Sequence, residues 1–361
     1  MPESSIVVRP QPMDSETYTA SSRLQAAGLA PAIAVFERAA AEVPLPTPPQ
    51  PMVLADYGAG TGHNSLLPLG AAIAVLRKRT TAEHSVLVAH TDTADNDFTE
   101  MFRTIEEDPD TYLRKDSAAF ASAVGRSFYG QIMPSNSVHL GWSSWAIQWL
   151  SRTPAEIDGH VHISDCADPQ VQAAFARQAA HDWHEFIAFR GRELCPGGRL
   201  VVMTMAVGED GEVGFRPLLR AIDDTLSELA GADLITAAEL AGMCIPTVSR
   251  REVDFTAPFA PSGRFERLEI EHLDVFDAED RFWARYQADG NAAEFGSRWA
   301  AFARAAVFPA LLTALPQDQI DARAGELFDR LEAGIAERMG AAPEQVRIPL
   351  AHVVLFKRPR S

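Results

Sequence analysis

Short apolar runs alternate with longer segments of helical periodicity through the first 206 residues. Apolar runs that stop at glycine or polar residues predict strands at 52–56, 85–90, 137–141, 160–164 and 199–206. Periodic apolar positions predict helices over 21–43, 64–79, 97–107, 115–124, 143–151 and 168–194. Strands that alternate with helices are typical of a doubly wound α/β sheet, which is the fold class predicted here.

The rhythm changes after residue 206. Helical patterns dominate 207–262 and 279–340, and two late strands are predicted at 267–272 and 346–357. Five prolines within residues 44–51 predict a stiff connector, because proline fits neither a helix interior nor a central strand. The predicted division is an N-terminal arm and cap helix (1–50), a ligand-binding core (51–206), a helical cap (207–262 and 276–345) and closing strands of the core sheet (263–275 and 346–361).

Composition narrows the possible partners and compartment. The 361 residues carry a net charge of −17, which argues against nucleic acid or an anionic membrane as the main partner. Cys166, Cys195 and Cys244 are too few and too widely spaced for a disulfide framework, so a reducing compartment is expected. Residues 1–12 lack the apolar run of a signal peptide, and no apolar stretch reaches the roughly 20 residues of a membrane span. We therefore expect a cytoplasmic protein.

A glycine-rich loop, Asp56-Tyr-Gly58-Ala-Gly60-Thr-Gly62, follows the first strand and opens a helix. Glycine lets a backbone pass close to a ligand and adopt positive φ. Dinucleotide sites use Gly-x-Gly-x-x-Gly and place pyrophosphate at the helix N-terminus. Here the spacing is Gly-x-Gly-x-Gly and an acid precedes it, which favours a ligand with a cationic sulfonium and no phosphate, such as S-adenosylmethionine. A glycine turn without a ligand and a dinucleotide site are the alternatives.

Asp92 stands just after the second predicted strand. Ligands of open α/β sheets lie outside the carboxyl ends of the strands, where an acid can accept both hydroxyls of a ribose. The alternative is a surface aspartate, because residues 91–96 are rich in turn formers. Beside the glycine loop, the ribose interpretation is favoured.

The segment Ser127–Pro154 resembles the SABATH family of S-adenosylmethionine-dependent carboxyl methyltransferases, which methylate salicylate, benzoate, jasmonate and indole-acetate in plants. The resemblance extends over segments 18–25, 56–66, 92–98 and 192–199 in the same order. It implies a class I methyltransferase fold, Rossmann-like, with a helical cap over the acceptor site. It also implies S-adenosylmethionine as cofactor, a small carboxylic acid as substrate and a homodimer.

The resemblance also assigns site residues. Its cofactor positions are Tyr18, Ser22, Asp56, Gly58, Gly60, Asn64, Asp92, Thr93, Ser127, Phe128, Ser143 and Ser144. Its acceptor positions are Gln25, Trp145, Gln148, Trp149 and Arg216, with Gln25 and Trp149 as the catalytic pair that holds the carboxylate. Trp145 stands where the family usually has tyrosine. Arg216 is expected to meet a second anionic group of the acceptor, or else to be a surface arginine at a helix start.

The chemistry of carboxylate methylation explains why an amide and an indole would suit the catalytic pair. A carboxylic acid has a pKa of about 4, so at neutral pH the acceptor is already ionised and needs no general base. Alignment and exclusion of water favour in-line displacement at the sulfonium. The amide of Gln25 and the indole N–H of Trp149 can hold the carboxylate without adding charge. Trp142, Trp145 and Trp149 have helical spacing, and Trp142 is expected to be core.

No metal site is predicted. His160 and His162 would alternate across a strand, and His181 and His184 lack a further ligand. Three other functions stay open: N-methylation of a small heterocycle by the same family, nicotinamide-dependent oxidoreduction, and non-catalytic binding of a small ligand. Methyl transfer to a ring nitrogen would depend on pH near neutrality, whereas transfer to a carboxylate would not.

Overall fold

The structure, a computed structural model, describes residues 15–260 and 262–359, with side chains from residue 29 onward. Its seven strands form one sheet in the order β3-β2-β1-β4-β5-β7-β6. The strands are β1 (Met52–Tyr57), β2 (Val86–Asp92), β3 (Ala119–Gly125), β4 (Val138–Ser144), β5 (Leu194–Met205), β6 (Leu268–Asp277) and β7 (Pro349–Lys357). Pairing is parallel from β3 to β5, and β7 runs antiparallel between β5 and β6. The strand order reverses between β1 and β4, which creates a switch point at their carboxyl ends.

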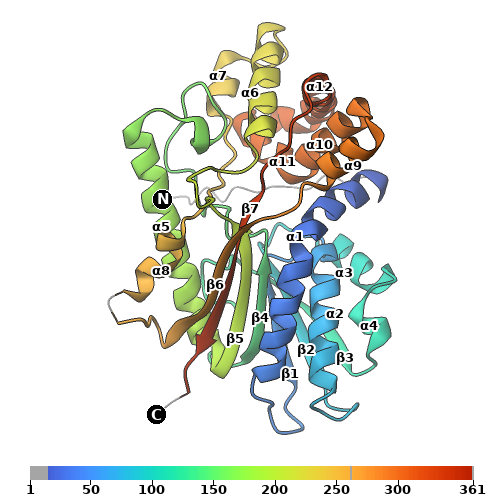
Figure 1. Cartoon of the computed structure of the whole chain (residues 1–361), viewed down its shortest axis with the longest axis vertical. Helices are drawn as coiled ribbons and strands as arrows, with labels where there is room; N and C mark the ends of the chain where they lie inside the picture. Colours follow the sequence, from blue (N-terminus) through green and yellow to red (C-terminus); the bar gives the residue numbers. More distant parts are fainter. Residues whose placement is uncertain (1–14, 261, 360–361) are drawn as a thin grey trace.

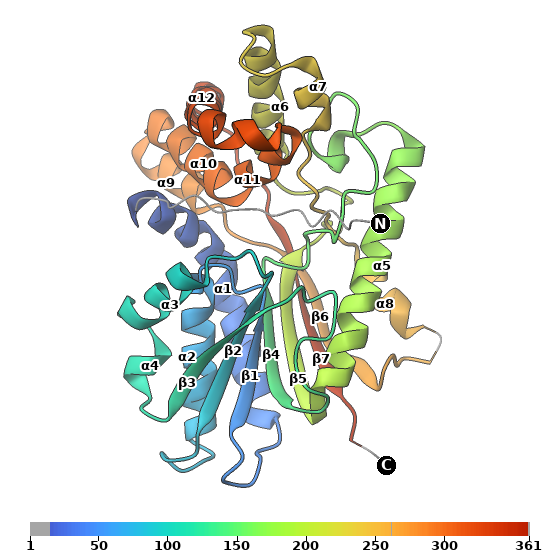
Figure 2. The ribbon, with the colours of Figure 1, turned by 180° about the vertical axis from the view of Figure 1, so that it is seen from behind.

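Helices cover both faces of this sheet (Figures 1 and 2). The longer ones near the sheet are α1 (Ser15–Glu42), α2 (His63–Arg77) and α5 (Pro169–Glu193), and the shorter ones are α3 (Phe98–Glu107), α4 (Tyr112–Lys115) and α8 (Glu252–Thr256). Apolar residues of α1 and α2 pack with one face of the strands, whereas α5 and α8 pack with the other. Parallel strands covered on both sides need nearly continuous apolar runs, and β1 and β4 are buried at almost every position.

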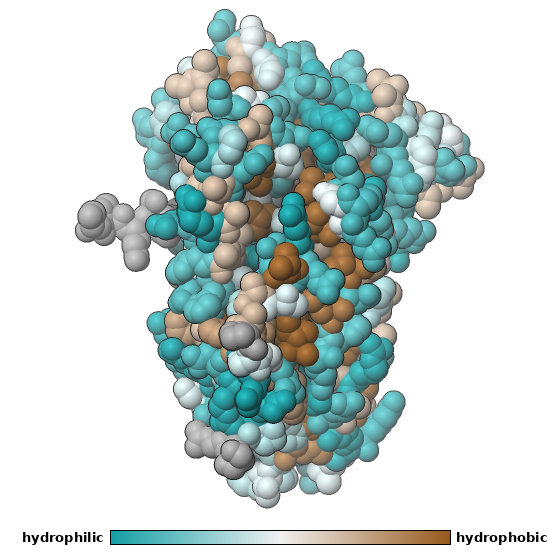
Figure 3. Space-filling model, turned by 60° about the vertical axis from the view of Figure 1, so that its left-hand side comes forward, coloured by the Kyte–Doolittle hydropathy of each residue, from teal (hydrophilic) through white to brown (hydrophobic). Residues whose placement is uncertain are grey.

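A second layer of helices lies beyond the carboxyl ends of the parallel strands, at the top of Figure 1. It consists of α6 (Arg216–Gly231), α7 (Ala237–Gly242), α9 (Arg281–Asp289), α10 (Ala292–Ala306), α11 (Phe308–Leu311) and α12 (Ile320–Ala341). Helix α1 contacts α9 and α10 of this layer and then runs down the sheet. Figure 3 shows a mainly hydrophilic surface, with hydrophobic residues gathered in the middle of one face. Among the described residues, no helix is both long and apolar enough to span a membrane.

Most predicted elements are confirmed, but the helix expected over 115–124 is wrong. Residues 119–125 form the edge strand β3, which pairs in parallel with β2. The segment is rich in alanine, whose local preference is helical, and strand pairing overrides that preference. Alternate residues Ala119, Ala121 and Ala123 pack against the core, as a strand requires.

The helix expected over 143–151 and the strand expected over 160–164 are also wrong. Strand β4 continues to Ser144, and Trp145 then takes a left-handed backbone conformation with φ of 54°. The chain turns back instead of winding into a helix, and Trp149 forms an isolated antiparallel bridge with Thr247. Residues 163–165 form a single 3₁₀ turn. Residues 195–198, Cys-Pro-Gly-Gly, lie inside β5, where the pairing register with β4 shifts.

Candidate functional site

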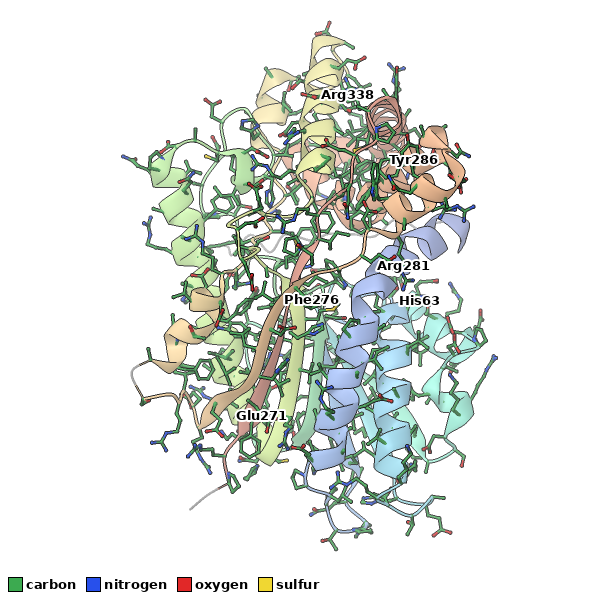
Figure 4. The ribbon with its side chains drawn as sticks, viewed as in Figure 1. His63, Glu271, Phe276, Arg281, Tyr286 and Arg338 are labelled. Atoms are coloured by element: carbon green, nitrogen blue, oxygen red, sulfur yellow. The ribbon has the colours of Figure 1, made fainter. Side chains whose placement is uncertain are left out.

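The glycine loop lies at the switch point, between the ends of β1 and β4. Gly58 has φ of 84°, and a Cβ atom on it would lie 2.4 Å from Cβ of Ala146 and 3.4 Å from Cε1 of Phe128. Residues from three distant parts of the sequence therefore meet at Gly58. The N–H groups of Gly58 and Ala59 donate to the carbonyl of Thr91 at 2.9 and 3.0 Å, which ties the loop to β2. In Figure 4, His63 marks the end of α2 that faces the helical layer, and the loop enters the helix there.

Asp92 is fastened to the same loop. Its Oδ2 accepts the N–H of Gly60 at 2.7 Å, and its Oδ1 accepts the N–H of Thr93 at 2.7 Å. The side chain of Asn96, which the sequence analysis did not select, donates to the carbonyl of Gly60 at 2.8 Å. Burial raises the pKa of the Asp92 carboxyl, and the two backbone donors oppose that shift. The carboxylate is thus fixed at the carboxyl end of β2, as the ribose hypothesis requires.

Asp56 does not line the loop surface but lies beneath it, 1% exposed. Its Oδ2 is 2.8 Å from Nδ1 of His90, and Nε2 of His90 is 2.9 Å from the hydroxyl of Tyr112. In the neutral form of His90, Nδ1 would donate to the carboxylate of Asp56, which only accepts, and Nε2 would accept from Tyr112. Burial, and then the charge of Asp56, raise the pKa of the Tyr112 hydroxyl, which keeps it a donor. His90 could have been selected from the sequence, as a histidine within the apolar strand before Asp92, whereas no sequence pattern marks Tyr112.

The end of β4 contributes the next group of predicted residues. The hydroxyl of Ser143 donates to the carbonyl of Tyr57 at 2.9 Å, so it joins β4 to β1 and is fully buried. Ser144 is buried beside it. Gln148 is buried, and its Oε1 accepts the hydroxyl of Thr204 at 3.3 Å. The amide of Gln148 is therefore already engaged with β5.

The three tryptophans of this segment lie in different surroundings. Trp142 is core, as predicted: it is fully buried, and its ring centroid is 4.8 Å from that of Phe36. Trp145 is partly buried with its ring near Phe215, and its Nε1 is buried with no hydrogen-bond partner among the described residues. Trp149 is partly buried, and its carbonyl accepts the hydroxyl of Tyr129. The left-handed turn at Trp145 therefore replaces the predicted helical stripe.

The other predicted positions are dispersed around these groups. Asn64 lies in the first turn of α2, Thr93 is exposed after β2, and Ser127 is exposed, with its Oγ accepting the N–H of Tyr129 at 3.3 Å. Arg216 begins α6 and lies 3.4 Å from Asp165 and 3.2 Å from Glu212, so two carboxylates already face its guanidinium. Tyr18, Ser22 and Gln25 lie on α1, but their side chains fall outside the described residues.

His160 and His162, which the sequence does not favour as metal ligands, have other side-chain partners. His160 Nδ1 lies 3.2 Å from Asp223, and His162 is buried with Nε2 3.1 Å from the hydroxyl of Thr247. Within 29–260 and 262–359, no group of three or more His, Cys, Asp or Glu side chains could hold a metal ion. His162 instead links the loop after Val161 to the segment that bridges Trp149.

Acid is expected to destabilise the protein through His162. Burial lowers the pKa of His162 to about 4, from an ordinary value of 6.5. Above pH 6.5 neither folded nor unfolded state binds this proton, and between pH 6.5 and 4 only the unfolded chain does, so stability falls as pH falls. The free energy of unfolding, measured by urea titration, should fall between pH 7.5 and pH 5 in both proteins. We expect the fall to be about 2 kcal/mol smaller in His162→Gln than in the parent.

The matched control for that titration is His184→Gln, because the His184 side chain is 50% exposed. This variant should lose as much stability as the parent over the same pH interval. Equal losses for the parent and His162→Gln would show that His162 does not carry the acid sensitivity.

Known proteins resemble this chain over most of its length. Residues 9–358 match the family described as "SAM dependent carboxyl methyltransferase". Salicylate carboxymethyltransferase from Clarkia breweri is 26% identical over 302 residues, which cover 80% of each chain. Anthranilate O-methyltransferase 1 from Zea mays is 26% identical over 355 residues, which cover 90% of each chain.

A solved structure described as loganic acid methyltransferase with SAH superimposes with a TM-score of 0.76. It shares 21% sequence identity, and the match covers 97% of this chain and 99% of that one. At this identity the likeness establishes the fold, which is the class I methyltransferase fold that the sequence predicted.

Proposed function

Because the chain belongs to the family of S-adenosylmethionine-dependent carboxyl methyltransferases, we propose that it converts a small organic acid to its methyl ester at the carboxyl ends of β1, β2 and β4. The observation that carries the proposal is the meeting of Gly58, Phe128 and Ala146 at the switch point, beside the anchored carboxylate of Asp92. These groups come from separate elements and meet where open α/β sheets bind their ligands.

The residues present fit S-adenosylmethionine. A side chain at position 58 would strike Ala146, so only glycine fits there. At Gly60 no described atom lies within 4 Å of a Cβ position, which leaves the loop backbone open to a ligand there. Asp92 offers acceptor oxygens for ribose hydroxyls, and the ring of Phe128 offers an apolar border for adenine. Asp56, below the loop, adds the negative charge that suits a cationic ligand. When bound, S-adenosylmethionine supplies an electrophilic methyl group on a sulfonium.

The remaining work of this chain is binding, orientation and exclusion of water. The acceptor acid is ionised at neutral pH, since its pKa is about 4. We assign its carboxylate to the indole N–H of Trp149 and the amide of Gln25, both neutral donors that leave the nucleophile its charge. Trp145 stands where the family usually has tyrosine, so an indole takes the place of an ionisable phenol at this position. The helical layer closes over this end of the sheet as a cap, which removes water from the opposite charges.

The quaternary structure and compartment complete the proposal. We place the protein in the cytoplasm as a homodimer. Three buried cysteines, Cys166, Cys195 and Cys244, are all unpaired, which is consistent with a reducing compartment. Light scattering coupled to size-exclusion chromatography measures the mass in solution directly, and a mass near twice 39.3 kDa is expected.

The test of the function is transfer of tritiated methyl from S-adenosylmethionine to a panel of small acids. Salicylate, anthranilate, loganic acid and gibberellic acid come first, because relatives of this chain carry those names. We expect at least one acid to give a product that loses its label as methanol in mild base, as an ester does. A base-stable product would indicate N-methylation instead, and binding of the cofactor without transfer to any acid would contradict the proposal.

A further inference from the structure

The last turn of α5 buries an ion pair that the proposed chemistry does not use. Arg190 Nη2 lies 2.8 Å from Oε1 of Glu193, and both side chains are 0% exposed. Taking two charges out of water costs several kcal/mol for each ion, and well-packed apolar residues often replace such pairs without loss of stability. Stability alone therefore does not account for this pair.

Almost all of its hydrogen bonds go to one loop, residues 128–133. Arg190 donates to the carbonyls of Phe128 and Gly130, each at 2.8 Å. Oε1 of Glu193 accepts the N–H groups of Ile132 at 2.6 Å and Met133 at 3.0 Å. Two side chains thus fix four backbone groups within six residues, through charge-assisted hydrogen bonds.

The pair also reaches the strand that delivers the glycine loop. The hydroxyl of Tyr57 donates to Oε2 of Glu193 at 2.8 Å, and the guanidinium carbon of Arg190 lies 4.3 Å from the centroid of the Tyr57 ring. Tyr57 immediately precedes Gly58. The ring of Phe128 stands against Gly58 from the other side and meets Phe186 of α5 edge to face at 5.6 Å. The pair therefore fixes the distance between the glycine loop at Gly58 and the loop that carries Phe128.

We propose that Arg190 and Glu193 are positioning residues that hold loop 128–133 against the glycine loop, and so shape the adenine side of the cofactor site. This inference rests on the proposed function, because it assigns Phe128 to adenine. It predicts that loss of the pair weakens binding of every ligand that carries the adenosine moiety. The proposed acceptor residues are not held by this pair, so turnover should be kept once the cofactor is saturating.

The main variant is Arg190→Met with Glu193→Leu, which leaves no unpaired buried charge. We expect a cooperative melt near that of the parent and at least a 10-fold weaker affinity for S-adenosylhomocysteine and for 5′-methylthioadenosine by calorimetry. Backbone amides of Ile132 and Met133 should exchange hydrogen at least 10-fold faster. KM for S-adenosylmethionine should rise by the same factor, with kcat changed less than 3-fold.

Two single variants complete the design. Arg192→Met removes an exposed charge of the same helical turn and should bind S-adenosylhomocysteine as the parent does. Glu193→Gln keeps an acceptor oxygen for Ile132 and Met133 without the charge, so it should lose affinity to a smaller degree, and it decides the matter if the double variant does not fold. Parent-like affinity and amide exchange in whichever of the two variants folds would overturn the inference. Failure of the parent itself to bind S-adenosylhomocysteine would overturn the proposed function as well.

Discussion

Replacing Gly58 with alanine is expected to abolish measurable S-adenosylhomocysteine binding and to destabilise the fold. The new Cβ would lie 2.4 Å from Cβ of Ala146, which no packed protein tolerates without a shift, and the residue must keep φ of 84°. A left-handed conformation costs a non-glycine residue about 1–2 kcal/mol, and overpacking costs about 1–3 kcal/mol more. Urea titration should therefore show an unfolding free energy lower by roughly 2–5 kcal/mol.

The neighbouring glycine provides the matched control. Gly60 also has positive φ, at 55°, but a Cβ on it would meet nothing within 4 Å. Gly60→Ala should therefore lose only about 1–2 kcal/mol, from the backbone conformation alone. Adding Ala146→Gly to Gly58→Ala removes the atom that is struck and should restore part of the stability. If Gly58→Ala and Gly60→Ala lose equal stability and Ala146→Gly restores none, the contact with Ala146 is not what limits this position.

The sequence predicted the central elements of the fold because their local and long-range preferences agree. Strands β1 and β2 are apolar runs that end at polar residues. A parallel strand that is covered on both faces requires only such a run. The failures came where a contact from elsewhere decides the conformation. Local composition favours helix at Ala119–Gly125, but pairing with β2 makes it a strand. The chain turns at Trp145 because the backbone N–H of Trp145 donates to the carbonyl of Met203, a residue far along the sequence.

The candidate site divides in the same way. Asp92 and Gly58 could be selected from the sequence, since strand ends and glycine spacing are local signals. The groups that support them could not, because each is defined by a partner in another element. His90, which contacts Asp56, is one such group. The Arg190–Glu193 pair is another: its i, i+3 spacing in the sequence is that of any helical salt bridge, and only the structure shows the loop that the pair holds.

Replacing Trp149 with phenylalanine is expected to lower kcat/KM for the acceptor acid by roughly 10- to 150-fold. Phenylalanine keeps an aromatic ring but removes the pyrrole ring with its N–H, and a hydrogen bond to a charged group contributes about 1.5–3 kcal/mol. The contacts that hold the segment in place use the backbone of Trp149: its carbonyl accepts the hydroxyl of Tyr129, and its bridge to Thr247 is main-chain. The phenylalanine should therefore sit in the same loop, and affinity for S-adenosylhomocysteine should stay within 3-fold of the parent.

Trp142→Phe is the control that separates donation from packing. Within the part of the chain that the structure describes, its buried indole N–H has no hydrogen-bond partner, so the same change at Trp142 removes core volume and no donor contact. It should lower the melting temperature and leave kcat/KM nearly unchanged. Trp149→Phe should lower kcat/KM and leave the melting temperature nearly unchanged, because the lost N–H is the one that would hold the carboxylate. Parent-like kinetics in Trp149→Phe, across every acid that the protein methylates, would mean that another donor aligns the nucleophile. Trp145, whose buried Nε1 has no partner among the residues described, would then be the residue to test.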